Sequence, residues 1–421
     1  MTTQLHCDEY DELSRGSYFF GGFGMAPGVM SGVPSWMPGI RLADPNVGPA
    51  GDTLVCIFLR GGIDGLNVIV PHGDDEYYRQ RPTLAIPRPG DAQASVVDLD
   101  GFFGLHPMLE PLHAIYEAGS LAVVHATGSP DDSHSHFQAM AAMERGVFAG
   151  GTYSGWLARH LATYDTGNSS ALRAMAVGEM LPLSLSGTPA TALQSLSEYR
   201  LAADDNAATL LGHLYQGKDD LLSQAARQTL DTLRALRLAE AETREVQGRA
   251  YPETDFGRAM HTVADLLDMD VGVEVACVDL DGWDTHAGQG AVEGFMATNL
   301  DNLAQGLTAF YEDMGPRMGN ITVLVMSEFG RRVRENAALG TDHGTGNMLL
   351  LMGDGLNGGQ VHSTWPGLHP EQQTGPGDLT ITVDYRHILA EITLKRLNNP
   401  RIAEVFPGFE TEDLGIAKPR A

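Results

Sequence analysis

The sequence predicts an α/β fold with a mostly parallel central sheet and helices on both of its faces. Five nearly continuous apolar runs have the composition of strands that are buried on both faces. Segments in which apolar residues recur every three to four positions, as on one face of a helix, separate these runs. Strands that alternate with helices are joined by crossover connections, and such connections make neighbouring strands parallel.

The expected strands begin at Thr53, where the run TLVCIFLR is nearly continuously apolar and leads directly into the glycine turn GGIDGLN. The other four runs are LAVVHA (121–126), VGVEVACVDL (271–280), ITVLVMS (321–327) and MLLLM (348–352). Helical periodicity is found in residues 108–119, 136–146 and 299–315. We expect these elements to form a single sheet domain over residues 52–420.

Two regions depart from this alternation of strands and helices. Residues 181–255 are loop-rich at first and then contain DDLLSQAARQTLDTLRALRLAEAETREVQG, a long amphipathic helical pattern with no evident buried strand. We expect a helical insertion that lies against the sheet domain. Residues 1–51 contain apolar stretches that Gly, Pro and Ser interrupt repeatedly. This segment is expected to lie outside the fold, as an N-terminal arm or a degenerate export signal.

Charge and composition exclude several classes of partner. The chain of 421 residues has 27 Lys and Arg against 54 Asp and Glu, a formal net charge of -27. Nucleic acids and anionic membranes are polyanions and would be repelled. No run reaches the ~18 apolar residues of a membrane span, so no integral membrane segment is expected. The three cysteines are too few for a disulfide framework or a cysteine metal site.

Acidic residues and histidines follow the predicted strands, where open parallel sheets bind their ligands. The candidate metal ligands are Asp64, Asp284, His286, Glu328, Asp342 and His343. Carboxylates and imidazoles suit zinc, manganese, iron and magnesium, whereas calcium prefers oxygen alone. The sequence therefore predicts one or two divalent ions, with zinc preferred and manganese, iron, magnesium or calcium as alternatives. For any one of these residues alone, a turn or a helix cap is the competing interpretation.

A nucleophile candidate comes from SPDDSHSHFQAM, which follows a predicted strand and opens a helix. Ser135, with Ser133 as the second choice, would lie near the helix N-terminus, where free backbone N–H groups hold an anion. A serine beside a metal can attack phosphorus or sulfur. The competing interpretation is a routine N-cap. The chain has no GxSxG motif, so an esterase triad is poorly supported.

Further polar residues have expected roles around such a site. Arg331 is the preferred clamp for an anionic ester, because a guanidinium pairs with two oxygens at once; a surface ion pair is the alternative. Asn67 and His136 are expected to support the metal ligands from behind. His106 and Trp283 are expected to be packing residues that shape the pocket.

Eight motifs occur in an order that resembles one bacterial family, domain of unknown function 1501. They are FLRGGIDGLNVIVP, FFGLHPML, SHSHFQAMAAMERG, GWDTH, MSEFGRRVREN, GTDHGTGN, VDYRHIL and VFPG, and they cover roughly residues 50 to 410. Family members resemble secreted relatives of the alkaline phosphatase and sulfatase superfamily, and many begin with a twin-arginine export signal. The resemblance implies an alkaline-phosphatase-like three-layer sandwich and a periplasmic or secreted location; without export, the protein would be cytoplasmic.

The resemblance also implies roles for particular residues. Asp64 would match the aspartate after the first strand, which binds one ion. Asp284 and His286 would match the Asp/His pair that binds the other ion, with His343 beside them. Ser135 would match the nucleophile.

Two pairs of residues depart from the superfamily pattern. The usual Asp-His pair is replaced by Glu328 followed by Phe329, so a ligand of the second ion must come from elsewhere, for instance from Asp342. Where the export signal has two arginines, this chain has Arg15-Gly16.

Three functions are compatible with these observations. The first is a metal-dependent hydrolase of phosphate or sulfate esters that uses a serine nucleophile, with a small anionic ester or a sulfated or phosphorylated glycan as substrate. The second is a catalytically degenerate binding or scaffold protein on the same fold. The third is a phosphomutase-like transfer through a seryl intermediate. The oligomeric state is not predicted.

Overall fold

A computed structural model describes residues 49–148, 152–168, 170–195, 205–216 and 246–420, together with isolated positions between 220 and 233. Within these residues, nine strands form one sheet in the order β13-β5-β12-β9-β1-β8-β6-β7, and β14 pairs with β5 beside this path. The strands are β1 (Thr53–Leu59), β5 (Leu121–Gly128), β6 (Ala174–Val177), β7 (Thr191–Leu193), β8 (Val275–Leu280), β9 (Ile321–Ser327), β12 (Asn347–Met352), β13 (Gln360–His362) and β14 (Val383–Asp384).

The sheet confirms the predicted α/β class and its mostly parallel character. All five predicted strands are present, and the pairs of β1 with β8 and β9, of β6 with β7 and β8, and of β5 with β13 and β14 are parallel. Only β12 runs antiparallel to its neighbours β5 and β9 within the described part of the sheet. A parallel neighbour needs a long crossover, usually a helix. The chain between β9 and β12 instead forms the hairpin of β10 (Arg331–Glu335) and β11 (Thr341–His343).

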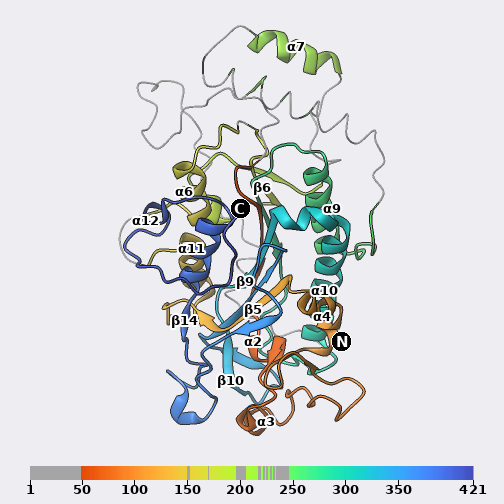
Figure 1. Cartoon of the computed structure of the whole chain (residues 1–421), viewed down its shortest axis with the longest axis vertical. Helices are drawn as coiled ribbons and strands as arrows, with labels where there is room; N and C mark the ends of the chain where they lie inside the picture. The colour runs from red at the N-terminus through yellow and green to blue at the C-terminus, as the bar shows by residue number, and fades with distance from the viewer. Residues whose placement is uncertain are drawn as a thin grey trace.

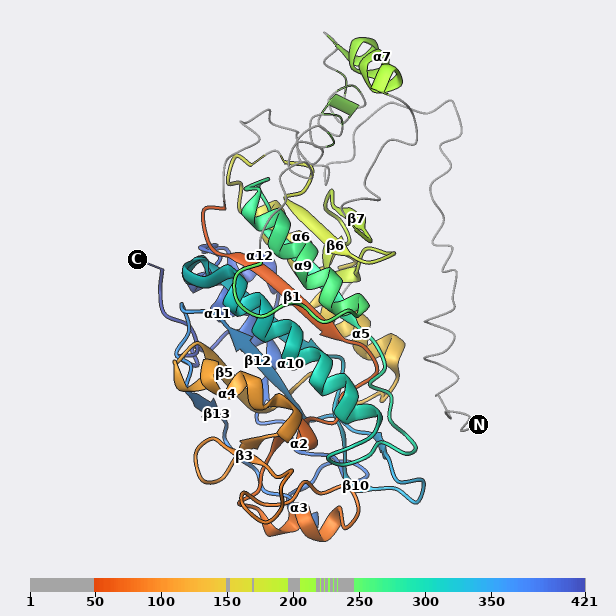
Figure 2. The same cartoon turned by 90° about the vertical axis from the view of Figure 1, so that its right-hand side faces the viewer.

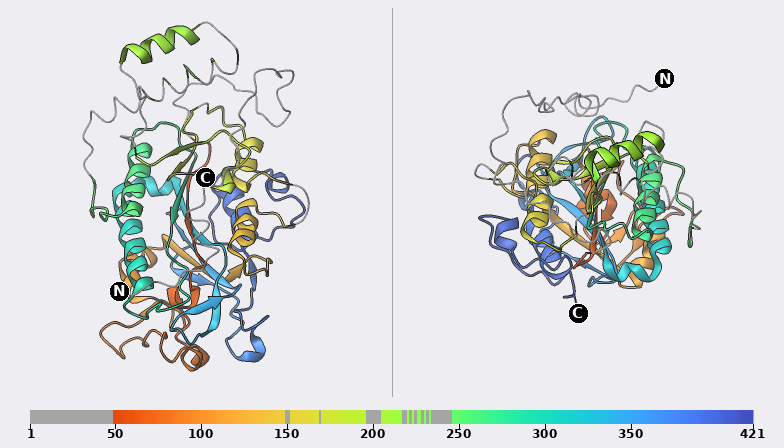
Figure 3. Two further views of the ribbon diagram at one scale, coloured as in Figure 1. Left: turned by 180° about the vertical axis from the view of Figure 1, so that it is seen from behind. Right: turned by 90° about the horizontal axis from the view of Figure 1, so that it is seen from above.

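Helices cover both faces of the sheet and give three layers (Figures 1 and 2). Helices α4 (His113–Glu117), α9 (Asp255–Asp268) and α10 (Phe295–Met314) lie on one face, while α6 (Trp156–Thr163), α11 (Tyr385–Lys395) and α12 (Ile402–Val405) lie on the other. The view from behind shows the same separation (Figure 3). Alternate residues of β1 supply the two cores: Val55, Ile57 and Leu59 face one, and Leu54, Cys56 and Phe58 face the other.

The three helices predicted for the sheet domain outside 181–255 are present. Residues 136–146 contain α5 (His136–Arg145), and the predicted range 299–315 overlaps the longer α10, which ends at Met314. Residues 108–119 form a 3₁₀ helix (Pro107–Leu112) that continues into α4. The 3₁₀ helix contains Pro111, which has no N–H to donate to an α-helical hydrogen bond.

Small elements gather at the end of the sheet where β1 and β5 finish (lower part of Figure 1). They are α2 (Gly65–Val68), α3 (Asp75–Gln80), the hairpin β10–β11, and a three-stranded sheet of β2 (Ile69–Val70), β4 (Gly104–Leu105) and β3 (Val97–Asp98). The segments that carry the candidate site residues enter or leave the sheet at this end.

Several predictions fall on residues outside this description. Residues 1–48, with the Arg15-Gly16 pair, are outside the described residues, and so is most of the long amphipathic pattern in 181–255. The described part of that range contains α7 (Asp205–Tyr215) and β7, a strand that was not expected there. β7 pairs with β6 at the sheet edge. In the described part of the chain, no helix has the length and apolar character needed to cross a membrane.

Truncation of a buried side chain of β1 tests how much this core contributes to stability. Ile57 is fully buried, and Ile57→Ala should lower the free energy of unfolding by about 2–5 kcal/mol, because the lost methyl groups leave a cavity. Leu394, which is about half exposed on α11, is the matched control, and Leu394→Ala should change the value by less than about 0.5 kcal/mol. Urea unfolding followed by circular dichroism measures both; equal effects would contradict the buried position of β1.

Candidate metal centre

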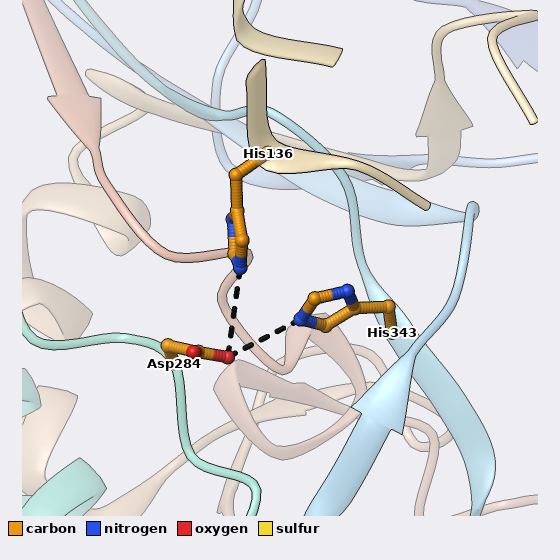
Figure 4. Close-up of side chains that lie close together, drawn as sticks. All are labelled: His136, Asp284 and His343. Carbon is orange, nitrogen blue, oxygen red and sulfur yellow. Dashed lines mark hydrogen bonds and ion pairs between the residues drawn. The ribbon is translucent and has the colours of Figure 1, made fainter. Parts of the chain in front are cut away.

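Three side chains from distant segments converge at the carboxyl edge of the sheet. His136, Asp284 and His343 each offer one ligand atom, and these atoms all lie within 4.8 Å of one another (Figure 4). Asp284 Oδ1 lies 3.7 Å from His136 Nε2 and 3.3 Å from His343 Nε2. Because imidazole nitrogen and carboxylate oxygen are the ligands that zinc and related ions take in proteins, the donor set fits a divalent metal.

His136 is held in place by Glu328. His136 is the first residue of α5, and its Nδ1 lies 2.9 Å from Glu328 Oε1, so Nδ1 carries the proton that is donated to this carboxylate. Glu328 follows β9 directly, is fully buried, and accepts a hydrogen bond of 2.8 Å from the backbone N–H of Gly61. The Nε2 atom of His136 is thereby directed to Asp284. A carboxylate behind a histidine in this way fixes the orientation of a metal-ligating ring.

His343 is oriented by a backbone carbonyl. Its Nδ1 lies 2.8 Å from the carbonyl oxygen of His134. A carbonyl only accepts hydrogen bonds, so Nδ1 carries the proton and Nε2 presents a lone pair to Asp284 when the ring is neutral. Burial lowers the pKa of His343, although the adjacent carboxylate of Asp284 opposes this effect. The ring is therefore in the neutral form that binds metals.

Asp284 is fixed by Arg331. The carboxylate lies in the loop after β8 and is buried, and Arg331 Nη2 approaches its Oδ1 to 2.6 Å. Burial opposes ionisation, but the interactions with the imidazoles of His136, His286 and His343 and the charge of Arg331 outweigh it and hold the pKa of Asp284 well below its usual range. The remaining donors of Arg331 reach the carbonyl oxygens of Gly61, Gly62 and Thr341. Arg331 thus orients Asp284, and this geometry does not support its predicted role as a clamp on an ester.

His286 and Asp342 form the outer rim of the centre. His286 Nε2 lies 3.1 Å from Asp284 Oδ1 and 2.9 Å from His343 Nε2, and its side chain is 28% exposed. Asp342 is 44% exposed and lies behind His286, with 3.6 Å between its Oδ1 and the Nδ1 of that ring. The structure therefore brings His286 to the predicted cluster, while Asp342 supports it from the solvent side.

The proton affinity of His136 reflects its acidic surroundings. Burial disfavours the charged ring, but the hydrogen bonds with Asp284 and Glu328 prevail and raise the pKa of His136 to about 9. The acidic surroundings therefore favour the protonated ring at neutral pH, or a metal cation in place of the proton. A divalent ion would replace that proton.

Phe329 closes the apolar side of the centre. Its ring centroid lies 4.9 Å from that of His136 and 4.7 Å from that of His343. Phe329, which by the resemblance stands at the histidine position of the usual Asp-His pair, therefore packs on two imidazoles. It excludes water from them, which strengthens the electrostatic interactions of the cluster.

Asp64 is engaged elsewhere. Arg81 forms two hydrogen bonds with its carboxylate, of 2.5 and 2.9 Å, and Gln289 donates a third of 2.6 Å. The side chains of Asp64 and Arg81 are both fully buried. The role of Asp64 as a metal ligand remains a prediction, and this closed ion pair favours a structural role: it joins the turn after β1 to the segment after α3.

Ser135 stands directly before His136, at the N-cap position of α5. Its backbone is extended, with φ −101° and ψ 123°, and its side chain forms no capping hydrogen bond with the helix. A side-chain N-cap was the alternative interpretation of Ser135, and this cap is not formed. Ser133, the second choice, donates its hydroxyl proton to Asp131 over 2.5 Å.

One pair of residues is arranged differently from the sequence prediction. Glu328 was predicted as a metal ligand and His136 as a residue that supports the ligands, whereas in the structure His136 lies in the cluster and Glu328 lies behind it. His136 begins a helix shortly after a predicted strand, so its position, like those of Asp64, Asp284 and Glu328, follows a strand end.

Substitution of Asp64 tests whether this residue has a structural role or is a metal ligand. Asp64→Asn should lower the free energy of unfolding by about 3–5 kcal/mol, because it leaves the buried Arg81 without its counter-charge. Zinc content per chain should stay unchanged. Urea unfolding and elemental analysis measure the two quantities, with Asp301→Asn, at an exposed position on α10, as control.

If the single variant does not fold, the double variant Asp64→Leu/Arg81→Met removes both charges and allows the same zinc measurement. A folded variant that has lost its zinc would show that Asp64 is a ligand after all.

Comparisons with solved structures give loose matches. One is a sulfatase from Pseudoalteromonas sp., at 11% identity, with 88% of this chain and 74% of that chain covered and a TM-score of 0.38. A putative sulfatase from Bacteroides thetaiotaomicron has 11% identity, coverage of 88% and 72%, and a TM-score of 0.33. An alkaline phosphatase from the Antarctic bacterium TAB5 has 10% identity, coverage of 72% and 92%, and a TM-score of 0.24. The function proposed below rests on the residues of this chain.

The comparison with curated proteins found no match. The model of one family, described as "protein of unknown function (DUF1501)", matches residues 52–395. This range contains most of the motifs that indicated the resemblance, and it includes every residue of the candidate metal centre. The chain therefore belongs to the DUF1501 family.

Proposed function

We propose that the protein is a metal-dependent hydrolase of phosphate or sulfate esters. The observation that carries the proposal is the convergence of ligand atoms from His136, Asp284 and His343 within 4.8 Å. The outer nitrogen of each imidazole is already engaged, one by Glu328 and the other by the carbonyl of His134, so both rings present Nε2 to the centre. Such outer partners are characteristic of metal-ligating histidines.

The donor set favours zinc and a catalytic type of site. Three protein ligands leave a coordination position for water or substrate, as in catalytic zinc sites, whereas structural sites are closed by four. When bound, the ion supplies Lewis acidity toward an ester oxygen and lowers the pKa of a hydroxyl group beside it. A single ion is proposed, because Asp64 is paired with Arg81 and Glu328 is hydrogen-bonded to His136, so that neither carboxylate is available for a second ion.

Ser135 is the proposed nucleophile. It adjoins the ligand His136 and lies at the amino end of α5, a helix of ten residues whose dipole favours an alkoxide or an anionic ester. Its oxygen would form the bond to phosphorus or sulfur, the alcohol would leave with a proton, and water would release the group from the serine. The proposed substrate is a small anionic ester or a sulfated or phosphorylated glycan, and export to the periplasm remains part of the proposal.

Metal analysis is the first test. The purified protein should contain about one zinc per chain. His136→Ala, Asp284→Asn and His343→Ala should each abolish stoichiometric binding, whereas Glu328→Gln should weaken it about 10–100-fold, because it only loosens the orientation of His136. Titration with zinc under competition by a chromogenic chelator gives the affinities. Full zinc affinity in all three ligand variants would exclude this centre.

The pH dependence of zinc affinity follows from His136. Its pKa is raised to about 9 in the metal-free protein, so zinc must displace a proton at neutral pH. The apparent dissociation constant should rise about tenfold for each pH unit below 9, and affinity should level off above it. In Glu328→Gln the pKa of His136 should fall, and the level region should begin at a lower pH. Zinc titrations across this pH range, with unfolding monitored in parallel, measure the slope.

Ser135→Ala tests the chemistry separately from the metal. The variant should lose turnover of nitrophenyl phosphate or sulfate by several orders of magnitude and keep its zinc. Ser133→Ala, two residues away, is the control and should retain most activity. Transfer of the group to an added alcohol instead of water would indicate the phosphomutase-like alternative. Equal activity in Ser135→Ala and the parent would exclude the serine mechanism.

The degenerate binding or scaffold protein remains the alternative, and one observation favours it. Two arginines near the centre are not available as a clamp for the ester anion: the donors of Arg331 are engaged by carbonyls and Asp284, and Arg81 is paired with Asp64. Zinc binding without turnover of any ester in a broad panel would support this reading and contradict the hydrolase.

A further inference from the structure

A second feature adjoins the candidate metal centre. A pocket of about 430 Å³ lies between the segment that precedes α5 and the loop that precedes β14, and His134 and Asp378 are among its lining residues. This volume is within the range of small-molecule sites. His134 belongs to both features, because its side chain lines the pocket and its carbonyl orients the ligand His343.

The charge of the pocket is opposite to that expected for an anion site. Three carboxylates line it, from Asp131, Asp132 and Asp378, and none of the described lining residues is Lys or Arg. Hydroxyl-bearing side chains make up much of the remaining lining: Ser129, Thr345, Thr374 and Thr380. A phosphate or sulfate would be repelled here, whereas an ammonium group would be attracted and alcohol groups would find hydrogen-bonding partners.

Asp378 provides a separate indication of a ligand. Its side chain is only 2% exposed, and its Oδ2 lies 2.6 Å from His134 Nε2. Its Oδ1 is buried and accepts no hydrogen bond from any described residue. A buried carboxylate oxygen without a donor is costly, and such groups in native proteins call for an explanation. A donor that arrives with a ligand would satisfy it.

His134 has a backbone conformation that fits a functional position. Its φ is +53°, in the left-handed region that residues other than glycine rarely adopt. This conformation directs the carbonyl of His134 to His343 and its ring to Asp378. Strain of this kind persists where the surrounding structure requires it. The pocket and the centre are therefore held together by one residue.

We propose that this pocket binds an amino sugar: a primary ammonium group flanked by hydroxyl groups. The ammonium is placed among Asp131, Asp132 and Asp378, and the ring hydroxyls bond to the surrounding Ser and Thr side chains. In the proposed hydrolase, this part is the alcohol portion of the ester, whose anionic group lies at the metal centre. The identity of the ester rests on the proposed function, whereas binding of the amino sugar does not.

Titration calorimetry with four probes tests the proposal. Glucosamine should bind to the purified protein at least about tenfold more tightly than glucose, because charged hydrogen bonds add to the hydroxyl contacts. Ethylamine, which has the charge without the hydroxyls, should also bind about tenfold more weakly, and glucose 6-sulfate should not bind to the chelator-treated protein. Chelator-treated and zinc-loaded protein are measured in parallel, and glucosamine should bind to both.

Variants locate the binding. Asp132→Asn and Asp378→Asn should each weaken glucosamine binding about tenfold, since each removes a negative charge beside the ammonium. Asp132 is exposed, so its variant stays informative if Asp378→Asn does not fold. Asp301→Asn, an exposed aspartate on α10, is the matched control and should bind as the parent does.

The outcomes separate the two proposals. Equal binding of glucosamine and ethylamine, absence of glucosamine binding, or unchanged binding in Asp132→Asn would each overturn the amino-sugar site. Glucosamine binding by a protein that takes up no zinc would uphold the pocket and reject the hydrolase. Zinc binding with ester turnover but without glucosamine selectivity would reject the pocket and uphold the hydrolase.

Discussion

The candidate centre depends on the compensation of one buried carboxylate. Asp284 has lost most contact with water, and an ionised group in that position is stable only with opposite charge and hydrogen bonds around it. Arg331 supplies the charge at 2.6 Å, and imidazoles of His286 and His343 approach the same oxygen to 3.1 and 3.3 Å. Since Arg331 is also tied to the carbonyls after β1, the position of Asp284 is coupled to the middle of the sheet.

The position of His136 is likewise coupled to the turn after β1. Glu328 accepts hydrogen bonds from both the Gly61 backbone and His136, so the end of β9, the turn after β1 and the start of α5 meet at one carboxylate. Gly61 has a φ of +117°, and a Cβ atom there would lie 2.6 Å from the backbone nitrogen of Asp284. A side chain at this position would thus be strained and would displace the carboxylate.

The distribution of charge around the centre bears on the substrate. The two buried arginines nearby have structural partners: Arg331 holds Asp284, and Arg81 holds Asp64. Positive potential for an ester would therefore come from the ion, the amino end of α5 and the partly exposed Arg332, while the adjoining pocket is acidic. An ester that carries its negative charge at one end and an ammonium at the other would satisfy both environments. The proposed hydrolase and the proposed amino-sugar site would then bind the two ends of one substrate.

The sequence by itself determined the class of the fold, the five main strands and the edge of the sheet where the polar residues gather, because periodicity and strand ends are local properties. It also determined that Asp284, His286 and His343 belong together. Only the tertiary structure decided that β12 is antiparallel, that His136 rather than Glu328 faces the centre, and that Asp64 pairs with Arg81. These outcomes depend on which partner each buried charge finds across long stretches of chain, and that choice is made by packing in three dimensions.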